Sequence, residues 1–309
     1  MDARITKHRL SNMLSYDWIK ILLAIAAAVG VLVMLFTMIA TRPTNAQTFL
    51  IYGYYGTSSG SDYYSHQDDL KNKNVFSYDI LKIGGEVFEG SYSSQVFAAR
   101  RTTSSGTVMF VSHDKNEEDE NATTRLEDLA ALGFTRGDKE TLLRDPEKFM
   151  QDCEAYLNGF FKDGALDEQA VKDCFLSRNG KDKRFRSASQ KQKGIQKERE
   201  RILKLQEDYA AVKRAFDEGS FTYTQVTLES NAHAGEKATL TVAINLSKLS
   251  GIENLFYYQK EGSSKQEKEN LNLIIFNNGE KKGMSDLKFE AVSYLKYLYD
   301  RYTPAAEAE

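Results

Sequence analysis

Residues 21–40 read ILLAIAAAVGVLVMLFTMIA, a run of 20 residues without a charged side chain. Thr37 is its one weakly polar residue. Because a helix rises ~1.5 Å per residue, this run is long enough to cross the ~30 Å hydrocarbon core of a bilayer. The stretch therefore predicts a single transmembrane helix, with everything after it on one side of the membrane.

The basic residues on either side of this run predict its orientation. Residues 1–20 carry four basic side chains, whereas the first basic residues after the run are Arg42 and Lys71. By the positive-inside rule, the N-terminus is expected in the cytoplasm and the C-terminal domain outside it. A cleaved signal peptide is the alternative, but its apolar region usually has only about 7–15 residues. The uncleaved anchor of a single-pass cell-membrane protein is therefore the preferred interpretation.

The composition is that of a folded protein that does not bind nucleic acid. Of the 309 residues, 41% are hydrophobic and 28% charged, and the formal net charge is −3. After residue 40 there are 37 basic and 42 acidic side chains, whereas nucleic-acid binding needs an excess of basic charge. The Walker A, HExxH and GxGxxG motifs are absent, so nothing in the sequence indicates a cofactor or a catalytic metal.

Hydrophobic periodicity predicts an α/β order of elements after the apolar run. The clearest helix covers residues 190–217, where one apolar stripe recurs at helical spacing. Residues 75–83 alternate like a strand that Gly84 and Gly85 break, and they open a strand–helix–strand sequence with the spacing of a parallel βαβ unit. The other predicted strands are 47–55, 107–111, 221–229, 239–246 and 271–276. The other predicted helices are 67–71, 92–101, 125–132, 167–176, 287–302 and one that opens at Pro146.

This order of elements predicts an α/β domain interrupted by a helical insertion lobe. The two halves of the sheet domain are expected to meet in space, as in hinged binding proteins. The predicted divisions are a cytoplasmic N-terminus (1–20), a transmembrane helix (21–40), two α/β halves (41–123 and 221–303), a helical lobe (124–220) and a tail (304–309).

Residues that follow the predicted strands are candidates for ligand binding. Ligands of open α/β sheets bind beyond the carboxyl ends of the strands. Tyrosines near this edge would suit recognition by stacking and hydrogen bonding. The ligand-binding residues predicted on this basis are Tyr54, Tyr55, Gly56, Ser112, His113 and Asn245.

Several segments resemble the extracytoplasmic solute-binding proteins of ABC transporters. They are the strand FSYDILKI, the helix YSSQVFAARR, the strand TVMFV after a Gly turn, and TLTVAINL and NLNLIIFNN followed by LKFEAVSYLKYLYDRY. The chain also looks like a group of single-span proteins of Gram-positive bacteria. The resemblance implies a periplasmic-binding-protein-like sheet domain and a membrane partner such as an ABC permease.

The two cysteines allow two interpretations. Cys153 and Cys174 are 21 positions apart and belong to no CxxC or Cys/His cluster, so a zinc site is not expected. In an exported domain they could form a disulfide. The alternative is a pair of small buried side chains on neighbouring helices.

Three further motifs have simple structural explanations. Residues 56–60 fit G-x-S-x-G, but no clear helix follows, so a flexible loop is preferred over a nucleophile elbow at Ser58. Residues 114–121 are better explained as a solvated acidic loop than as a calcium site. Residues 178–186 are interpreted as a solvated basic loop, with an anionic lipid or wall polymer as the alternative partner.

These observations lead to three functional hypotheses. The first is a non-enzymatic, solute-binding-like module that is tethered to the membrane beside an ABC transporter. The second is a structural or assembly partner of a membrane complex or envelope component. An esterase that uses Ser58 is the third and least supported.

Overall fold

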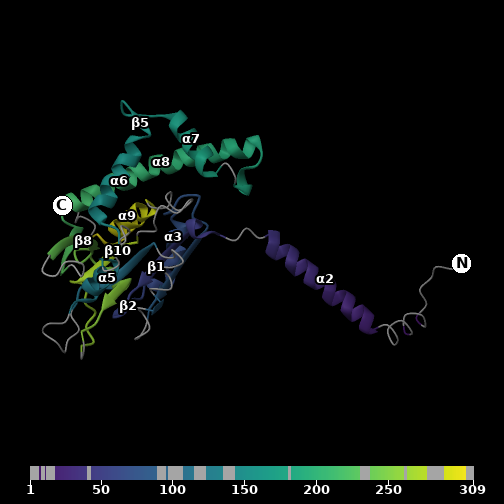
Figure 1. Cartoon of the computed structure of the whole chain (residues 1–309), viewed down its shortest axis with the longest axis horizontal. Coiled ribbons are helices and arrows are strands. Elements are labelled where there is room, and N and C mark those ends of the chain that lie inside the picture. The colour runs from purple at the N-terminus through teal and green to yellow at the C-terminus, as the bar shows by residue number, and fades with distance from the viewer. Residues whose placement is uncertain are drawn as a thin grey trace, which may run out of the picture. The chain divides into compact units, whose positions relative to one another are not determined.

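The structure is a computed structural model in which the chain divides into two compact units, Met1–Pro43 and Thr44–Glu309 (Figure 1). Each unit is described by itself. The residues described are 7, 11, 18–39, 43–88, 95–96, 107–114, 123–134, 143–179, 182–229, 237–260, 263–276 and 289–303.

The N-terminal unit contains one long apolar helix, α2 (Trp18–Ile39). From Trp18 to Leu35 this helix is long and apolar enough to cross a membrane, and none of that stretch is buried within the protein. Both a membrane anchor and a signal sequence have this form. The predicted apolar segment is therefore a helix that is compatible with either role.

The second unit is built on a mixed six-stranded sheet in the order β3-β1-β4-β10-β8-β7. Strand β1 runs parallel to β3 and β4, and the neighbours from β4 to β7 are antiparallel. The predicted mixed sheet is therefore confirmed. Its strands are β1 (Thr48–Gly53), β3 (Lys82–Val87), β4 (Val108–Ser112), β7 (Thr222–Glu229), β8 (Lys237–Asn245) and β10 (Leu271–Ile275).

Helices cover both faces of this sheet. In β4, Val108 and Phe110 belong to the larger apolar core, and Met109 and Val111 belong to the smaller one on the opposite face. The smaller core is closed by α5, and the larger one by α3, α6, α8 and α9 (Figure 1). The α-helices of this unit are α3 (Tyr63–Asn72), α5 (Arg125–Phe134), α6 (Pro146–Asn158), α7 (Glu168–Asn179), α8 (Ala188–Asp217) and α9 (Glu290–Tyr302).

Capping residues define where the predicted helices begin. The side chain of Asp145 accepts hydrogen bonds from the backbone N–H groups of Glu147 and Lys148, with Pro146 as the first residue of α6. Ser187 and Gln190 form a capping box at the start of α8. The two longest helices predicted in the middle of the chain are thus confirmed, and their start signals are readable in the sequence.

The predicted strand at residues 75–83 is wrong in its position. Regular structure resumes only in β3, which includes Gly84 and Gly85 rather than ending before them. A Cβ on Gly84 would lie 3.0 Å from Leu50 Cδ2, and one on Gly85 would lie 3.0 Å from the Ile51 carbonyl oxygen. Close packing against β1 therefore favours the two glycines inside the strand.

Smaller elements lie in segments that the sequence predicts to be loops or purely helical. The predicted loop 56–65 contains β2 and the start of α3, and the helical segment 124–220 includes a short hairpin of β5 and β6. Of the helix predicted at 92–101, only residues 95–96 lie within the described part of the chain. The smaller elements are β2 (Thr57–Ser59), β5 (Phe161–Lys162), β6 (Ala165–Leu166), β9 (Phe256–Tyr258), η1 (Asn45–Gln47), η2 (Lys183–Phe185) and η3 (Ile252–Asn254).

Candidate functional site

Arg125, at the start of α5, contacts three of the residues predicted to bind a ligand. Its Nη1 donates a 3.1 Å hydrogen bond to Ser112 Oγ. Its guanidinium carbon lies 5.5 Å from the centre of the Tyr55 ring, within the range of a cation–π contact. A Cβ on Gly56 would lie only 2.4 Å from the same carbon. The structure therefore brings these three residues together, around an arginine that the sequence analysis did not single out.

Each of the other three predicted residues has a contact within the fold. The ring of Tyr54 is buried in the smaller apolar core. The His113 N–H donates to the Asn270 carbonyl oxygen at 2.8 Å. The Asn245 side chain accepts from the Ser247 N–H at 2.9 Å, although the end of β8 lies at the same edge of the sheet as Ser112.

No disulfide joins the two cysteines. Cys153 is fully buried on α6, and Cys174 is half-buried on α7. The Cys174 Sγ donates to Glu198 Oε1 at 3.4 Å, within the hydrogen-bonding range of sulfur. Of the two interpretations that the sequence allowed, the structure therefore contains the pair of thiols on separate helices.

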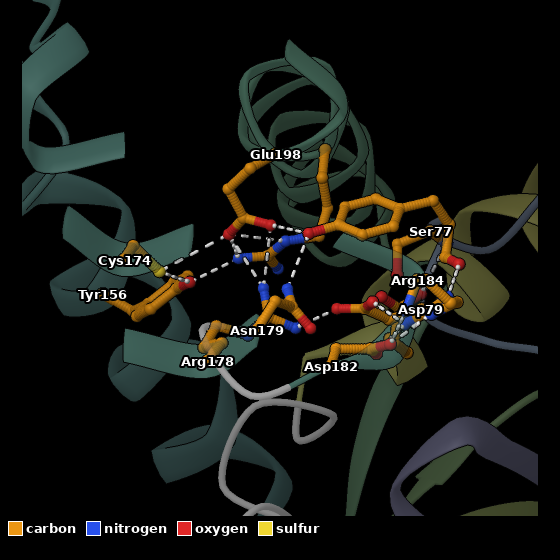
Figure 2. Close-up of polar contacts among 12 residues, drawn as sticks. Ser77, Asp79, Tyr156, Cys174, Arg178, Asn179, Asp182, Arg184 and Glu198 are labelled. Carbon is orange, nitrogen blue, oxygen red and sulfur yellow. Dashed lines mark hydrogen bonds and ion pairs between the residues drawn. The ribbon is translucent and has the colours of Figure 1, made fainter. Parts of the chain in front are cut away.

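Glu198 of α8 is the centre of a buried cluster of charged side chains (Figure 2). Its side chain is fully buried, yet Oε1 lies 2.8 Å from Arg178 Nη1 and 2.8 Å from Arg201 Nη2. The Tyr78 hydroxyl donates to Oε2 at 2.8 Å. A buried carboxylate is tolerated when donors surround it in this way.

Asp79 is the second acidic centre of this cluster. Arg178 Nη2 lies 2.8 Å from Asp79 Oδ2, and Arg184 Nη2 lies 2.9 Å from Oδ1. Arg184 also pairs with Asp182 at 2.8 Å. Because Arg178 contacts both Glu198 and Asp79, it fastens the segment between α3 and β3 to α7 and α8, as Figure 2 shows.

The electrostatics of the cluster favour fixed protonation states. Burial opposes the charge of Glu198, but Arg201 and Arg178 outweigh it and lower its pKa to about 2. Burial raises the pKa of the Tyr78 hydroxyl, and the charge of Glu198 adds to the effect. The pKa of the Cys174 thiol is raised for the same two reasons. At neutral pH the carboxylate is a weak base, and the phenol and thiol are protonated, which suits a structural cluster better than a catalytic one.

This cluster is not predicted from the sequence because its residues match patterns typical of surfaces. Arg178 and Arg184 lie in the predicted basic loop, yet their side chains point inward to Asp79. Glu198 and Arg201 occupy the buried side of α8. Charged residues that interrupt the apolar stripe of a long helix are the signal that could have identified them.

A pocket of about 480 Å³ opens beside the cluster, where α3 and the segment leading to β3 face α8. This volume lies in the range of small-molecule sites, which is ≈ 300–1,000 Å³. The apolar lining residues all come from one side of the pocket, which also carries Lys71, Asn74 and Ser77; they are Leu70, Phe76, Ile80 and Ile83. Tyr78, which lines the same pocket, connects it to the buried cluster. We call it the α3–α8 pocket.

Cations dominate the polar lining of the α3–α8 pocket. Lys197 is exposed and forms no ion pair with any residue that the structure describes, and its Nζ lies 6.0 Å from the centre of the Tyr78 ring. Glu200 is the one acidic side chain among the lining residues. The other three cations have acidic partners, in the pairs Arg201–Glu198, Lys204–Asp208 and Lys71–Asp68.

The chain matches no protein-family model, and no curated protein matches it. Within the described ranges, no group of three or more His, Cys, Asp or Glu side chains could hold a metal ion. The functional proposal therefore depends on the geometry of the fold and its pockets.

Proposed function

We propose that this is a membrane-anchored, extracytoplasmic, non-enzymatic binding protein whose α3–α8 pocket takes an anionic organic solute. The observation that carries the proposal is the position of Lys197. It places a positive charge at the pocket without a carboxylate partner among the described residues. An anion bound there would gain a charge-assisted contact without displacing an existing ion pair.

The buried cluster supports this proposal because it fixes the walls of the pocket. Tyr78 and Arg201 both line the pocket and both hydrogen-bond to Glu198. A wall that is held before the ligand arrives loses less conformational entropy on binding. The cluster therefore acts as a supporting layer for the site.

A second pocket, of about 470 Å³, lies between α6 and α8 and is less suited to an anion. Its acidic residues Glu154 and Asp217 balance its basic residues Lys213 and Arg214. Lys213 is also paired with Glu154 at 3.2 Å. The excess of positive charge in its lining therefore favours the α3–α8 pocket as the site of an anion.

We further propose that the domain is related to the extracytoplasmic solute-binding proteins and works beside an ABC permease. The parallel unit β3-β1-β4, with helices on both faces of the sheet, is consistent with that architecture. The apolar helix α2 is consistent with an anchor that keeps the domain close to a membrane partner.

Lysine labelling of the full chain in zwitterionic nanodiscs tests the proposed site. An amine-reactive reagent is applied with hexanoate, hexyl phosphate or hexanol, and each modified lysine is quantified by mass spectrometry. We expect the two anions, but not the alcohol, to slow modification of Lys197 several-fold. Lys193, exposed on the same helix but outside the pocket lining, is the matched control. Equal modification of Lys197 with and without either anion would refute the proposal.

A further inference from the structure

We infer that the ligand of the α3–α8 pocket is an anionic amphiphile, an acyl chain that ends in a carboxylate or phosphate. Its head group contacts Lys197 and Lys204, and its chain covers the apolar side of the pocket. This inference rests on the proposed function and adds the chemical class of the ligand.

The two sides of the pocket differ in chemistry. Lys197, Arg201 and Lys204 come from α8, at the i, i+4, i+7 spacing of one helical face. The apolar residues come from α3 and the segment 76–83 on the opposite side. A ligand that satisfies both sides needs a charged end and an apolar body.

The apolar residues of the pocket keep some exposed surface. Phe76, Ile80 and Ile83 are only partly buried, although they pack against the larger core. A small hydrophilic anion would leave their exposed surface in water. An acyl chain would remove that surface from water, which is favourable in proportion to the apolar area buried.

The same lining contains a hydroxyl group that is available to a ligand. Ser77 lines the pocket, and its Oγ is buried without a hydrogen-bond partner among the residues that the structure describes. A buried hydroxyl that makes no hydrogen bond is unfavourable, so a ligand oxygen within its reach would be stabilised. The Ser77 backbone N–H is already bound to Glu290 Oε2 at 3.1 Å, which holds this residue in position.

Chain length is the variable that tests the inference. The full chain in zwitterionic nanodiscs is labelled on lysine in the presence of hexanoate, octanoate, decanoate or dodecanoate. Dodecanoate has six more methylenes than hexanoate. If three of them are buried, the concentration that half-protects Lys197 should be roughly 60-fold lower for dodecanoate. Dodecanol enters the bilayer but lacks the charge, and it is expected to protect Lys197 far less.

Two variants add a test of charge that does not depend on folding of the core. Lys197→Gln should weaken dodecanoate binding at least fivefold, measured through protection of Lys204, whereas Lys193→Gln should leave it unchanged. Glu200→Gln removes the one acidic side chain of the lining and should strengthen binding. Unchanged affinity in Lys197→Gln would overturn the inference.

The remaining outcomes separate this inference from the proposed function. If hexanoate and dodecanoate protect Lys197 equally, the site binds anions, but the inference that its ligand is an amphiphile is wrong. If dodecanol protects Lys197 as well as dodecanoate does, the inference that the ligand carries a charged head group is wrong. If no anion protects, both proposals fail. Nanodiscs with added phosphatidylglycerol identify the source: protection without any added acid indicates a bilayer lipid, and protection by dodecanoate alone indicates a free acid.

Discussion

Glu198 Oε1 and Arg201 Nη2 lie 2.8 Å apart and one turn from each other on α8, and both side chains are buried. Ion pairs with this spacing usually lie on a helix surface and contribute only about 0.2–0.5 kcal/mol. Here Arg178 of α7 contacts the same carboxylate, so the pair is part of the packing between two helices. Removal of one member leaves buried charges without their partner.

Glu198→Gln is expected to lower the free energy of unfolding by about 3–5 kcal/mol, because Arg201 would remain buried without its ion-pair partner and Arg178 would keep only Asp79. Chemical denaturation of the full chain, followed by far-UV circular dichroism, measures this loss. Glu200→Gln, two positions away and exposed, is the matched control and should change the stability by no more than about 0.5 kcal/mol. Similar losses in the two variants would contradict a special role for the buried carboxylate.

Local sequence patterns predicted the elements whose residues repeat at a regular spacing. The stripe of α8 and the apolar strand β4 are such elements, and both occur where the sequence places them. Residues 75–83 alternate just as clearly but are not a continuous strand. Two of their side chains bond to residues far away in the sequence. Tyr78 donates to Glu198, 120 positions away, and Asp79 accepts from Arg178, 99 positions away. Such distant contacts override local propensity.

The predicted ligand-binding residues and the α3–α8 pocket also differ in how far a local sequence pattern can identify them. The sequence rule for strand ends identified Tyr55, Gly56 and Ser112, which do meet in space. The α3–α8 pocket is formed by two segments, 70–83 and 197–204, that are far apart in the sequence. No local motif relates these segments, so only the packing of α8 over α3 and β3 reveals that site.

Gly56→Ala is expected to be more destabilising than Gly164→Ala. Both glycines have a φ of +80°, which costs an L-residue roughly 1 kcal/mol or more. A Cβ at Gly164 has no atom within 4 Å, whereas one at Gly56 would lie 2.4 Å from Arg125 Cζ. Thermal unfolding of the two variants separates backbone strain from this contact. Equal shifts in melting temperature would mean that Arg125 moves aside without cost.

A buried histidine makes the fold sensitive to mild acid. His66 Nε2 lies 2.9 Å from the Tyr294 hydroxyl, and burial, with a smaller effect of Arg301, lowers the pKa of His66 to about 3. The unfolded chain binds this proton near pH 6.5, so stability is lost as pH falls from about 6.5 toward 3, by up to ~1.4 kcal/mol per pH unit. Glu198 adds to this loss only below about pH 4.5, the ordinary pKa of its side chain.

The window from pH 5 to 6.5 therefore isolates His66. His66→Gln, which keeps a hydrogen-bonding group for Tyr294 but takes up no proton, should flatten the dependence of unfolding free energy on pH in that window. His113→Gln, outside the apolar core, is the control for the substitution itself. Denaturation curves at several pH values measure both slopes, and a slope that survives in His66→Gln would assign the acid sensitivity to another group.

The cysteines give a prediction about oxidation. Cys153 is fully buried, and burial together with the charge of Glu198 raises the pKa of the Cys174 thiol. Because the thiolate is the reactive form, native-state alkylation of both should be slow. After denaturation without a reductant, the protein should take up two alkyl groups, as seen by intact-mass measurement. Uptake of none would indicate a disulfide, which would remove the thiol that Cys174 donates to Glu198 Oε1.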